Sequence, residues 1–210
     1  MALPTLSSRD KILDVAEALF ARRGFEGVGM REIATAAGLG KSSLFHHFRS
    51  KPQLYYEVLG RVIERLHDRL APVVASHSGS IEKLDRLIDV LVDALAEQPT
   101  TARLLLRALF EEDATAHDQL PEAIKCEQVL ADTLEGIQRL LREGVDAGVF
   151  RSVSVAHTVQ TLIGATVYHF ASGELGDGLL GRPLLSAEAV SRRKEELHNL
   201  FHHGLVVRPA

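Results

Sequence analysis

The segment 28–51, VGMREIATAAGLGKSSLFHHFRSK, limits the possible folds of this chain more than any other stretch of its sequence. Its first part carries apolar residues at the spacing of one helix face: Met30, Ile33, Ala34 and Ala37. Gly38 follows this pattern and predicts the end of the helix, because glycine adopts the left-handed capping conformation without a steric penalty at Cβ. The segment therefore predicts a short helix that ends in a tight turn.

A second short helix is predicted from about Lys41, directly after that turn, with Leu44 and Phe48 on its inner side. Its outer side carries cationic and hydrogen-bonding groups: Lys41, Ser42, Ser43 and His46. A small apolar face beneath a cationic, hydrogen-bonding face is typical of a helix that enters a DNA groove. The simpler alternative is an ordinary pair of helices in a bundle, in which the polar side chains are only solvated.

The distribution of charge agrees with DNA contact at one end of the chain. The net charge of the 210 residues is −4, which argues against a general polyanion binder. Residues 1–60 carry eight Lys/Arg and six Asp/Glu, a net of +2, so the rest of the chain has a net of −6. A mildly basic N-terminal region on an acidic remainder favours local contact with phosphate.

The hydrophobic pattern predicts an all-α protein of about nine helices, with a three-helix head at residues 1–50 and a helical body at residues 51–210. Serine or threonine is expected to cap several helices: Ser7 or Ser8 the first, Ser50 the fourth, and Thr100 a helix that runs to about Glu112. The glycine-rich stretch 172–183 is expected to be a mobile loop, and the last helix is expected at about 186–203.

The segment 154–170 is apolar on nearly every side of its predicted helix. A helix of this kind needs apolar partners on all sides. In a chain of this length, we expect one of those partners to be a second subunit.

The first quarter of the chain resembles the TetR family of bacterial transcriptional repressors. The matching stretches are ILDVAEALFARRGFEG, MREIATAAGL, KSSLFHHF and the Ser50–Lys51 pair, which follow one another without a gap. The remaining residues agree only in architecture, as a mostly helical body of suitable length. The resemblance implies a homodimer in which a small molecule bound by the body alters the affinity of the head for operator DNA.

The resemblance also implies which residues of the head contact DNA, mostly at phosphates: Gly29, Arg31, Lys41, Ser42, Ser43, Phe45, His46, His47 and Lys51. Two departures from the family pattern stand out. Val28 and Gly29 replace the usual Thr or Ser, so a side-chain cap gives way to bare backbone N–H groups. Phe45 replaces the usual Tyr, which removes a hydroxyl. These departures bear on the operator sequence that is bound rather than on DNA binding itself.

The resemblance places the ligand pocket in the body, between the fourth helix and the following three. The candidate ligand-binding residues are Arg103, Arg107, Phe110, His117 and Tyr168. Arg103 and Arg107 lie one helical turn apart, so together they can clamp an anion. The alternative is a pair of surface arginines matched by Glu111 and Glu112, with the aromatic residues in the core.

The sequence gives little support to enzymatic or metal chemistry. GxSxG, a glycine-rich phosphate loop and HExxH are absent, so no catalytic residue and no cofactor is expected. His198 and His202 have the spacing of a metal-binding pair, but no third ligand has matching spacing, which favours a solvated or interface role. Cys126 is the only cysteine, which excludes an intrachain disulfide, and it is expected to be inert.

These features predict a DNA-binding transcriptional regulator, and the resemblance implies a homodimeric repressor that a small-molecule effector releases from a near-palindromic operator. No signal-peptide core or membrane-length apolar run is present, so we expect a cytoplasmic protein without a membrane partner. The alternative is a helical small-molecule binder, or a metal-dependent enzyme, that does not act on DNA.

Overall fold

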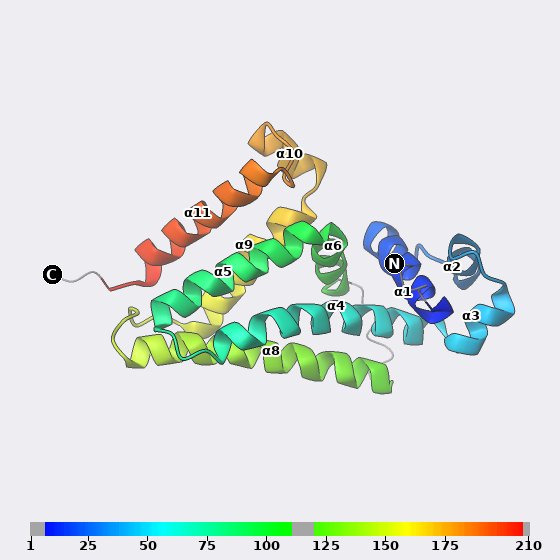
Figure 1. The fold of residues 1–210 in the computed structure, drawn as a ribbon, viewed down its shortest axis with the longest axis horizontal. Helices are drawn as coiled ribbons and strands as arrows, with labels where there is room; N and C mark the ends of the chain where they lie inside the picture. The colour runs from blue at the N-terminus through cyan, green and yellow to red at the C-terminus, as the bar shows by residue number, and fades with distance from the viewer. Residues whose placement is uncertain (1–6, 111–119, 208–210) are drawn as a thin grey trace, which may run out of the picture. The chain divides into compact units, whose positions relative to one another are not determined.

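The structure, a computed structural model, describes residues 7–110 and 120–207 (Figure 1). Within these ranges the chain forms ten helices: α1 (Ser8–Arg23), α2 (Met30–Ala36), α3 (Lys41–His47), α4 (Lys51–Val74), α5 (Ser80–Glu97), α6 (Pro99–Ala108), α8 (Pro121–Asp146), α9 (Val155–Ala171), α10 (Glu174–Leu180) and α11 (Ala187–Leu205). The β-structure in the described ranges is one isolated bridge between Phe150 and Val206. The all-α prediction is therefore confirmed.

The chain divides into two compact units, and three helices contribute to both. The first unit combines residues 1–64 with 103–129, and the second combines residues 65–102 with 130–210. The unit boundaries fall inside α4, α6 and α8. Each unit has its own buried side chains and is described separately below.

In the first unit, α1 begins directly after Ser7, one of the two predicted caps. The Ser7 hydroxyl accepts the N–H of Asp10 at 3.1 Å and donates to the Asp10 carboxylate at 2.6 Å. This hydroxyl holds the pKa of the Asp10 carboxyl below its usual value. At the other end, Gly24 has φ 75, a conformation that favours glycine, and its N–H donates to the carbonyl of Phe20.

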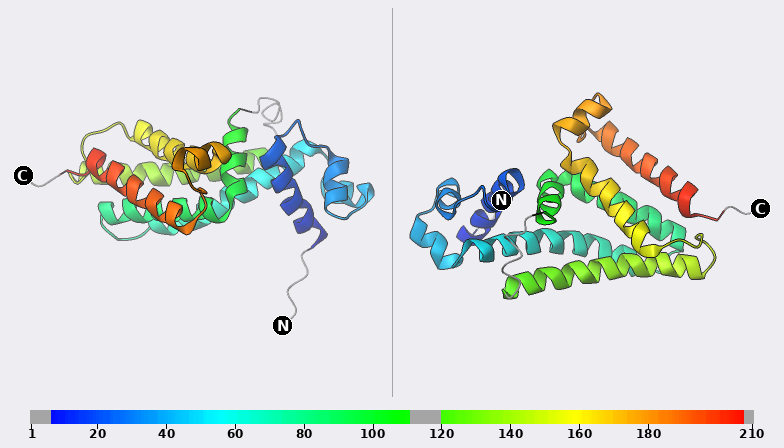
Figure 2. Two further views of the ribbon diagram at one scale, coloured as in Figure 1. Left: turned by 90° about the horizontal axis from the view of Figure 1, so that it is seen from above. Right: turned by 180° about the vertical axis from the view of Figure 1, so that it is seen from behind.

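The helices α2 and α3 form the predicted helix–turn–helix, and Figure 2 shows them beside α1. Gly38 lies between them with φ 70, as the sequence predicted for a left-handed turn residue. Ile33 of α2 and Leu44 of α3 are completely buried, and so is Phe48 directly after α3. Burial of an aliphatic or aromatic side chain contributes roughly 1.5–3 kcal/mol, so these three residues hold the two short helices in place.

The helix α4 begins at Lys51 with Ser50 as its cap, as predicted. The Ser50 hydroxyl accepts the N–H of Gln53 at 3.2 Å, and the Gln53 side chain in turn accepts the N–H of Arg49 at 2.8 Å. These bonds satisfy backbone donors that have no partner within the helix. Pro52 lies in the first turn, where its missing N–H costs little.

The apolar core of the first unit is not formed by residues 1–50 alone. Val58 of α4, Leu104 of α6, and Ala123 and Cys126 of α8 belong to the same buried cluster as Phe20 and Leu44. All four are at most 5% exposed. The last turns of α6 and the first turns of α8 are therefore part of the structure that supports α2 and α3.

The second unit contains α5, α9, α10 and α11, and three side-chain contacts with aspartates join α5 to α11. Lys194 lies 2.7 Å from Asp93, His198 lies 3.1 Å from Asp89, and His202 lies 2.5 Å from Asp85. Because the numbers rise along α11 as they fall along α5, the two helices run antiparallel. The face of α5 beneath them is apolar, and Leu84, Leu87 and Ile88 are fully buried.

Two sequence-based expectations for the helices were wrong. α6 begins at Pro99 rather than behind a Thr100 cap, and it ends at Ala108 rather than near Glu112, which lies outside the described residues. Proline opens a helix readily because the first turn does not need its N–H.

The stretch 172–183 contains the helix α10 rather than only a mobile loop. Gly176 is in α10 for close packing: a Cβ there would lie 2.3 Å from the Ser172 hydroxyl and 2.8 Å from a methyl group of Leu184. The Asp177 carboxylate also accepts the N–H of Leu184 at 2.7 Å, which fixes the segment after α10. Within residues 7–110 and 120–207, no helix is both long enough and apolar enough to cross a membrane.

Candidate nucleic-acid interface

The helix α3 has one face in the core and one face exposed. Leu44, its buried residue, is covered completely. The exposed residues on the other side include most of the predicted DNA contacts: Lys41, Ser42, Phe45 and His46. Ser43 and His47 are half-buried at the edges of this face. The predicted contact residues of α3 are thus brought together on one accessible strip.

Aromatic contacts order the side chains of this strip. The Lys41 ammonium lies 5.5 Å from the centre of the Phe45 ring, which is 39% exposed. The rings of His46 and His47 meet edge to face with their centres 5.4 Å apart. Cation–π and edge-to-face contacts of this kind restrict the side chains without neutralising the ammonium.

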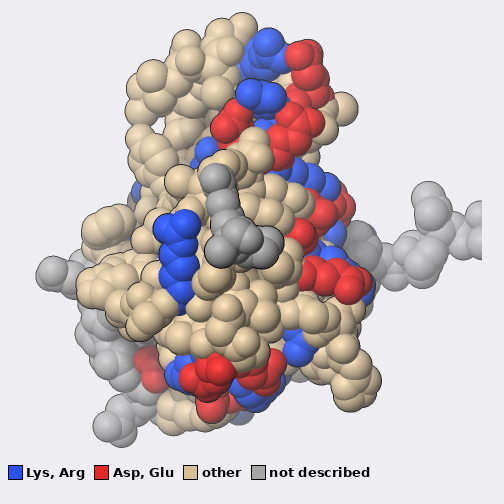
Figure 3. All heavy atoms as spheres, turned by 90° about the vertical axis from the view of Figure 1, so that its left-hand side faces the viewer, with Lys and Arg blue, Asp and Glu red and all other residues tan. Residues whose placement is uncertain are grey.

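The basic side chains of α2 and α3 have no carboxylate partner among the described residues, whereas several other cations of the first unit have one. Arg31 and Lys41 are exposed, and in the described part of the chain neither forms a salt bridge with a carboxylate. Other cations of this unit are paired: Arg9 with Glu57, Arg61 with Asp14, and Lys125 with Glu64. Figure 3 shows a face of the second unit, on which cationic and anionic side chains are mixed. Arg31 and Lys41 therefore keep their charge available for a phosphate group.

Lys51 is placed differently from Lys41. Its side chain is only 21% exposed, its ammonium lies 4.2 Å from the centre of the Phe25 ring, and the nearest Glu26 oxygen is 3.9 Å away. Lys51 is also the first residue of α4. The lysine thus supports the loop after α1, and its remaining exposed part lies beside a helix N-terminus, where anions are favoured.

Gly29 precedes α2 as its N-cap, and no side chain caps this helix. The residue is exposed, its φ is −102, and a Cβ there would meet no atom within 4 Å. The backbone at this position does not require glycine, and a side chain fits there without strain.

The predicted ligand-binding residues are not brought into one pocket within either unit. Arg103 is exposed, and Phe110, which follows α6, is 77% exposed. Tyr168 belongs to α9 in the second unit and is 53% exposed, and His117 lies outside the described residues. The guanidinium of Arg107 instead donates to main-chain carbonyls of α1, which the helical spacing alone did not indicate.

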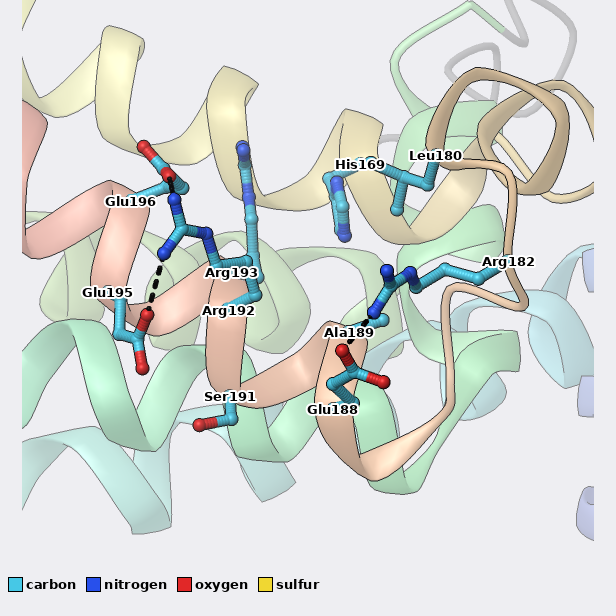
Figure 4. A pocket seen from close by; sticks show the side chains of 10 residues that line it. All are labelled: His169, Leu180, Arg182, Glu188, Ala189, Ser191, Arg192, Arg193, Glu195 and Glu196. Carbon is cyan, nitrogen blue, oxygen red and sulfur yellow. Dashed lines mark hydrogen bonds and ion pairs between the residues drawn. The ribbon is translucent and has the colours of Figure 1, made fainter.

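A cavity of about 720 Å³ lies in the second unit between α9, α10 and α11 (Figure 4). His169 points into it from α9, and Arg193 rises beside it from α11. Burial, and secondarily the charge of Arg193, lowers the pKa of His169 to about 4, so its ring is neutral at pH 7. Sequence reasoning missed this pair, because no local pattern connects residues on different helices.

The described residues do not support a metal site. They contain no group of three or more His, Cys, Asp or Glu side chains that could hold a metal ion. His198 and His202 stack with their ring centres 6.2 Å apart and face Asp89 and Asp85.

Burial, followed by the charges of Glu127 and Glu64, raises the pKa of the Cys126 thiol to about 11. This cysteine is therefore protonated at neutral pH.

Comparison with known proteins covers both units of the chain. The family model described as bacterial regulatory proteins of the tetR family matches residues 12–58. The model described as the tetracyclin repressor-like C-terminal domain matches residues 81–200. The HTH-type transcriptional repressor KstR2 of Mycolicibacterium smegmatis is 30% identical over 145 residues, which are 69% of this chain and 68% of that protein.

Solved structures with the same fold cover nearly the whole chain. The ketosteroid transcriptional regulator KstR2 of Mycobacterium tuberculosis has a TM-score of 0.76 at 22% identity and covers 96% of each chain. AibR, solved in complex with isovaleryl coenzyme A and operator DNA, has a TM-score of 0.73 at 16% identity and covers 92% of this chain and 97% of its own. At these identities the likeness concerns the fold.

Proposed function

The chain belongs to the TetR family of ligand-responsive, DNA-binding transcriptional repressors, and we propose that it works as a homodimer on a near-palindromic operator. In this proposal residues 1–50 bind DNA and residues 51–210 carry effector binding and dimerisation. Members of this family are regulators rather than enzymes. We also propose that the protein acts in the cytoplasm, where its DNA target lies.

The exposed strip on α3 is the observation that carries this proposal. Leu44 is fully buried beneath it while Lys41 and His46 remain accessible, so the helix is held by the core and still offers its polar side. Two such helices, one from each subunit, meet successive major grooves when they are about 34–36 Å apart.

We assign different roles to the residues at this interface. Lys41 contacts a phosphate, and Ser43 and His46 lie nearest to the base edges. The remaining contacts hold the backbone of the duplex on either side of α3: Gly29, Arg31, Ser42, Phe45, His47 and Lys51. Contacts to phosphate set the position and most of the affinity, whereas contacts to base edges select the sequence.

The dimer interface is proposed on α9 and α11 of the second unit. Both helices leave large apolar side chains exposed, with Tyr168 53% and Leu200 57% accessible. A groove of about 390 Å³ between these helices includes Leu200 and Phe201. Two helices from each subunit in a four-helix arrangement would cover these side chains, which a monomer leaves in water.

We propose an acyl-coenzyme A thioester as the effector class, which the AibR complex with isovaleryl coenzyme A supports. The effector would bind in the body, within residues 51–210. It releases the operator only if it binds one arrangement of the two heads better than the other. The shift in operator affinity then equals this difference in effector affinity and cannot exceed it.

The test is a gel shift with the DNA segment upstream of the protein's own gene. We expect a complex that isovaleryl-CoA or a longer-chain acyl-CoA dissociates, whereas free coenzyme A does not. Sedimentation at micromolar concentration should show a dimer. A stable monomer contradicts the homodimer, and indifference to all acyl-CoA probes contradicts the effector class without touching the DNA-binding proposal.

A further inference from the structure

We propose that Arg107 of α6 is a positioning residue for operator binding, which holds the C-terminal end of α1 and thereby fixes α2 and α3. Its Nε donates to the carbonyl oxygen of Ala21 at 3.1 Å, and its Nη2 donates to that of Arg22 at 2.9 Å. The inference rests on the proposed DNA-binding function. It assigns Arg107 to the head rather than to an effector.

The acceptors explain why an arginine suits this position. The carbonyls of Ala21 and Arg22 lie in the last turn of α1, where helical carbonyls have no N–H donor further along the helix. That end of a helix also carries partial negative charge, which a cation stabilises. The planar guanidinium offers several N–H donors in a fixed geometry and therefore reaches two adjacent carbonyls at once, which a lysine ammonium does less well.

The end of α1 is in turn bonded to α2. Arg23, the next residue, donates from Nε to the carbonyl of Gly27 at 2.9 Å. Its two terminal nitrogens donate to the two carboxylate oxygens of Glu32 in α2, at 2.6 and 2.9 Å. The segment between Arg23 and Glu32 includes Gly24 with φ 75, and it has little freedom once Arg23 is bonded to Gly27 and Glu32. Contacts thus continue from α6 through the end of α1 to α2.

Apolar packing carries the same connection into the core. Leu104, on α6 one turn before Arg107, is completely buried in the cluster that also contains Phe20 and Leu44. All these residues belong to the first unit of the chain. A displacement of α6 therefore acts on α1 directly, by a route that does not pass through α4.

The experiment compares operator binding by full-length Arg107→Ala, Arg107→Lys and a matched control, Arg103→Ala. Arg103 lies one turn earlier on α6 and is exposed, so its substitution removes the same charge from the same helix. The labelled upstream DNA segment serves as the probe in fluorescence anisotropy at several salt concentrations. We expect Arg107→Ala to weaken binding by about fivefold, a part of the value of its two hydrogen bonds in each chain, and Arg107→Lys to weaken it less.

The salt dependence separates positioning from direct contact. Arg107→Ala should keep the wild-type slope of log affinity against log salt, because no phosphate contact is lost. Hydrogen exchange should accelerate in residues 24–36 of this variant and stay unchanged in α5. The Arg103→Ala control should match the wild type in affinity and in exchange.

Three results would overturn the proposal. Arg107→Ala could equal Arg103→Ala in affinity and exchange, or its slope could fall by about one per chain, as for a direct phosphate contact. If circular dichroism shows that Arg107→Ala is unfolded, Arg107→Lys and Arg107→Gln take its place. Operator affinity and hydrogen exchange equal to the wild type in both of these variants would then contradict the proposal. Failure of the DNA-binding function itself appears differently, as a wild-type protein without salt-dependent binding.

Discussion

Substitution of Lys41 by alanine is the most direct way to test the exposed strip of α3. The ammonium is free of carboxylates in the described residues and is held only against the Phe45 ring, at 5.5 Å. Its loss should leave the fold intact, because the residue is exposed while the core beneath depends on Leu44. Any loss of operator affinity in the variant is then a loss of contact with DNA.

The expected magnitude follows from counterion release. One phosphate contact per chain gives two per dimer, so the slope of log affinity against log salt should become shallower by about 1.8. Relative to a 1 M reference, this corresponds to a loss of about 30-fold at 0.15 M salt and about 200-fold at 0.05 M salt. The effect must therefore grow as the salt concentration falls.

The assay is fluorescence anisotropy with the upstream DNA segment over a series of salt concentrations. Arg86→Ala is the matched control, because Arg86 is exposed on α5 and its substitution removes the same charge. The reasoning is refuted if Lys41→Ala keeps the wild-type slope, or if both variants lose the same affinity at every salt concentration.

Three further predictions concern other parts of the chain. Gly29→Ser should stabilise the protein by about a few tenths of a kcal/mol in a denaturant titration, because a serine side chain can cap α2 there without a clash. Operator affinity, measured by anisotropy, should stay equal or rise, and a weaker operator complex would contradict this prediction. Cys126 should resist a thiol reagent such as DTNB in the native protein and react only after unfolding, since burial raises its pKa to about 11 and it is 5% exposed; rapid native labelling would show an open site. His169 has a pKa lowered to about 4, so between about pH 6.5 and pH 4 the unfolded chain binds a proton that the folded chain does not. The free energy of unfolding should therefore fall as the pH falls over this range. After allowance for solvent screening, this loss should be about 1–2 kcal/mol smaller in His169→Gln than in the wild type. Equal losses in the two proteins, measured by denaturation at the same protein concentration, would contradict this prediction.

The helices were predictable because their signals are local. The apolar spacing around Ile33 and Leu44, the Ser7 and Ser50 caps, and the left-handed Gly38 each depend on a few neighbouring residues. Such patterns state which side of a helix is buried, and the fully buried Leu44 follows from them. The same patterns placed Lys41 on the accessible side.

The contacts between distant segments were not predictable in the same way. Arg107 shows the spacing of an anion clamp with Arg103, but its partners are carbonyls of α1, a helix far earlier in the sequence. His198 and His202 have a metal-like spacing, yet their neighbours are aspartates of α5. Periodicity identifies a face and not what lies against it.

Glycine was misleading in one place for a related reason. Gly176 contributed to the loop expected at 172–183, because glycine usually marks flexible segments. In the structure it is required by close approach of Ser172 and Leu184 to α10. The sequence signal is the same for conformational freedom and for tight packing, and only the neighbours distinguish the two.

The measurement that tests the central claim most directly is a hydroxyl-radical footprint of the wild-type protein on its operator. Two subunits that each insert one α3 should protect two stretches on one face of the duplex, about 10 base pairs apart, or a multiple of that spacing. The bound complex should contain an even number of chains. A single protected stretch, or protection on opposite faces of the duplex, would contradict the proposed arrangement of the two heads.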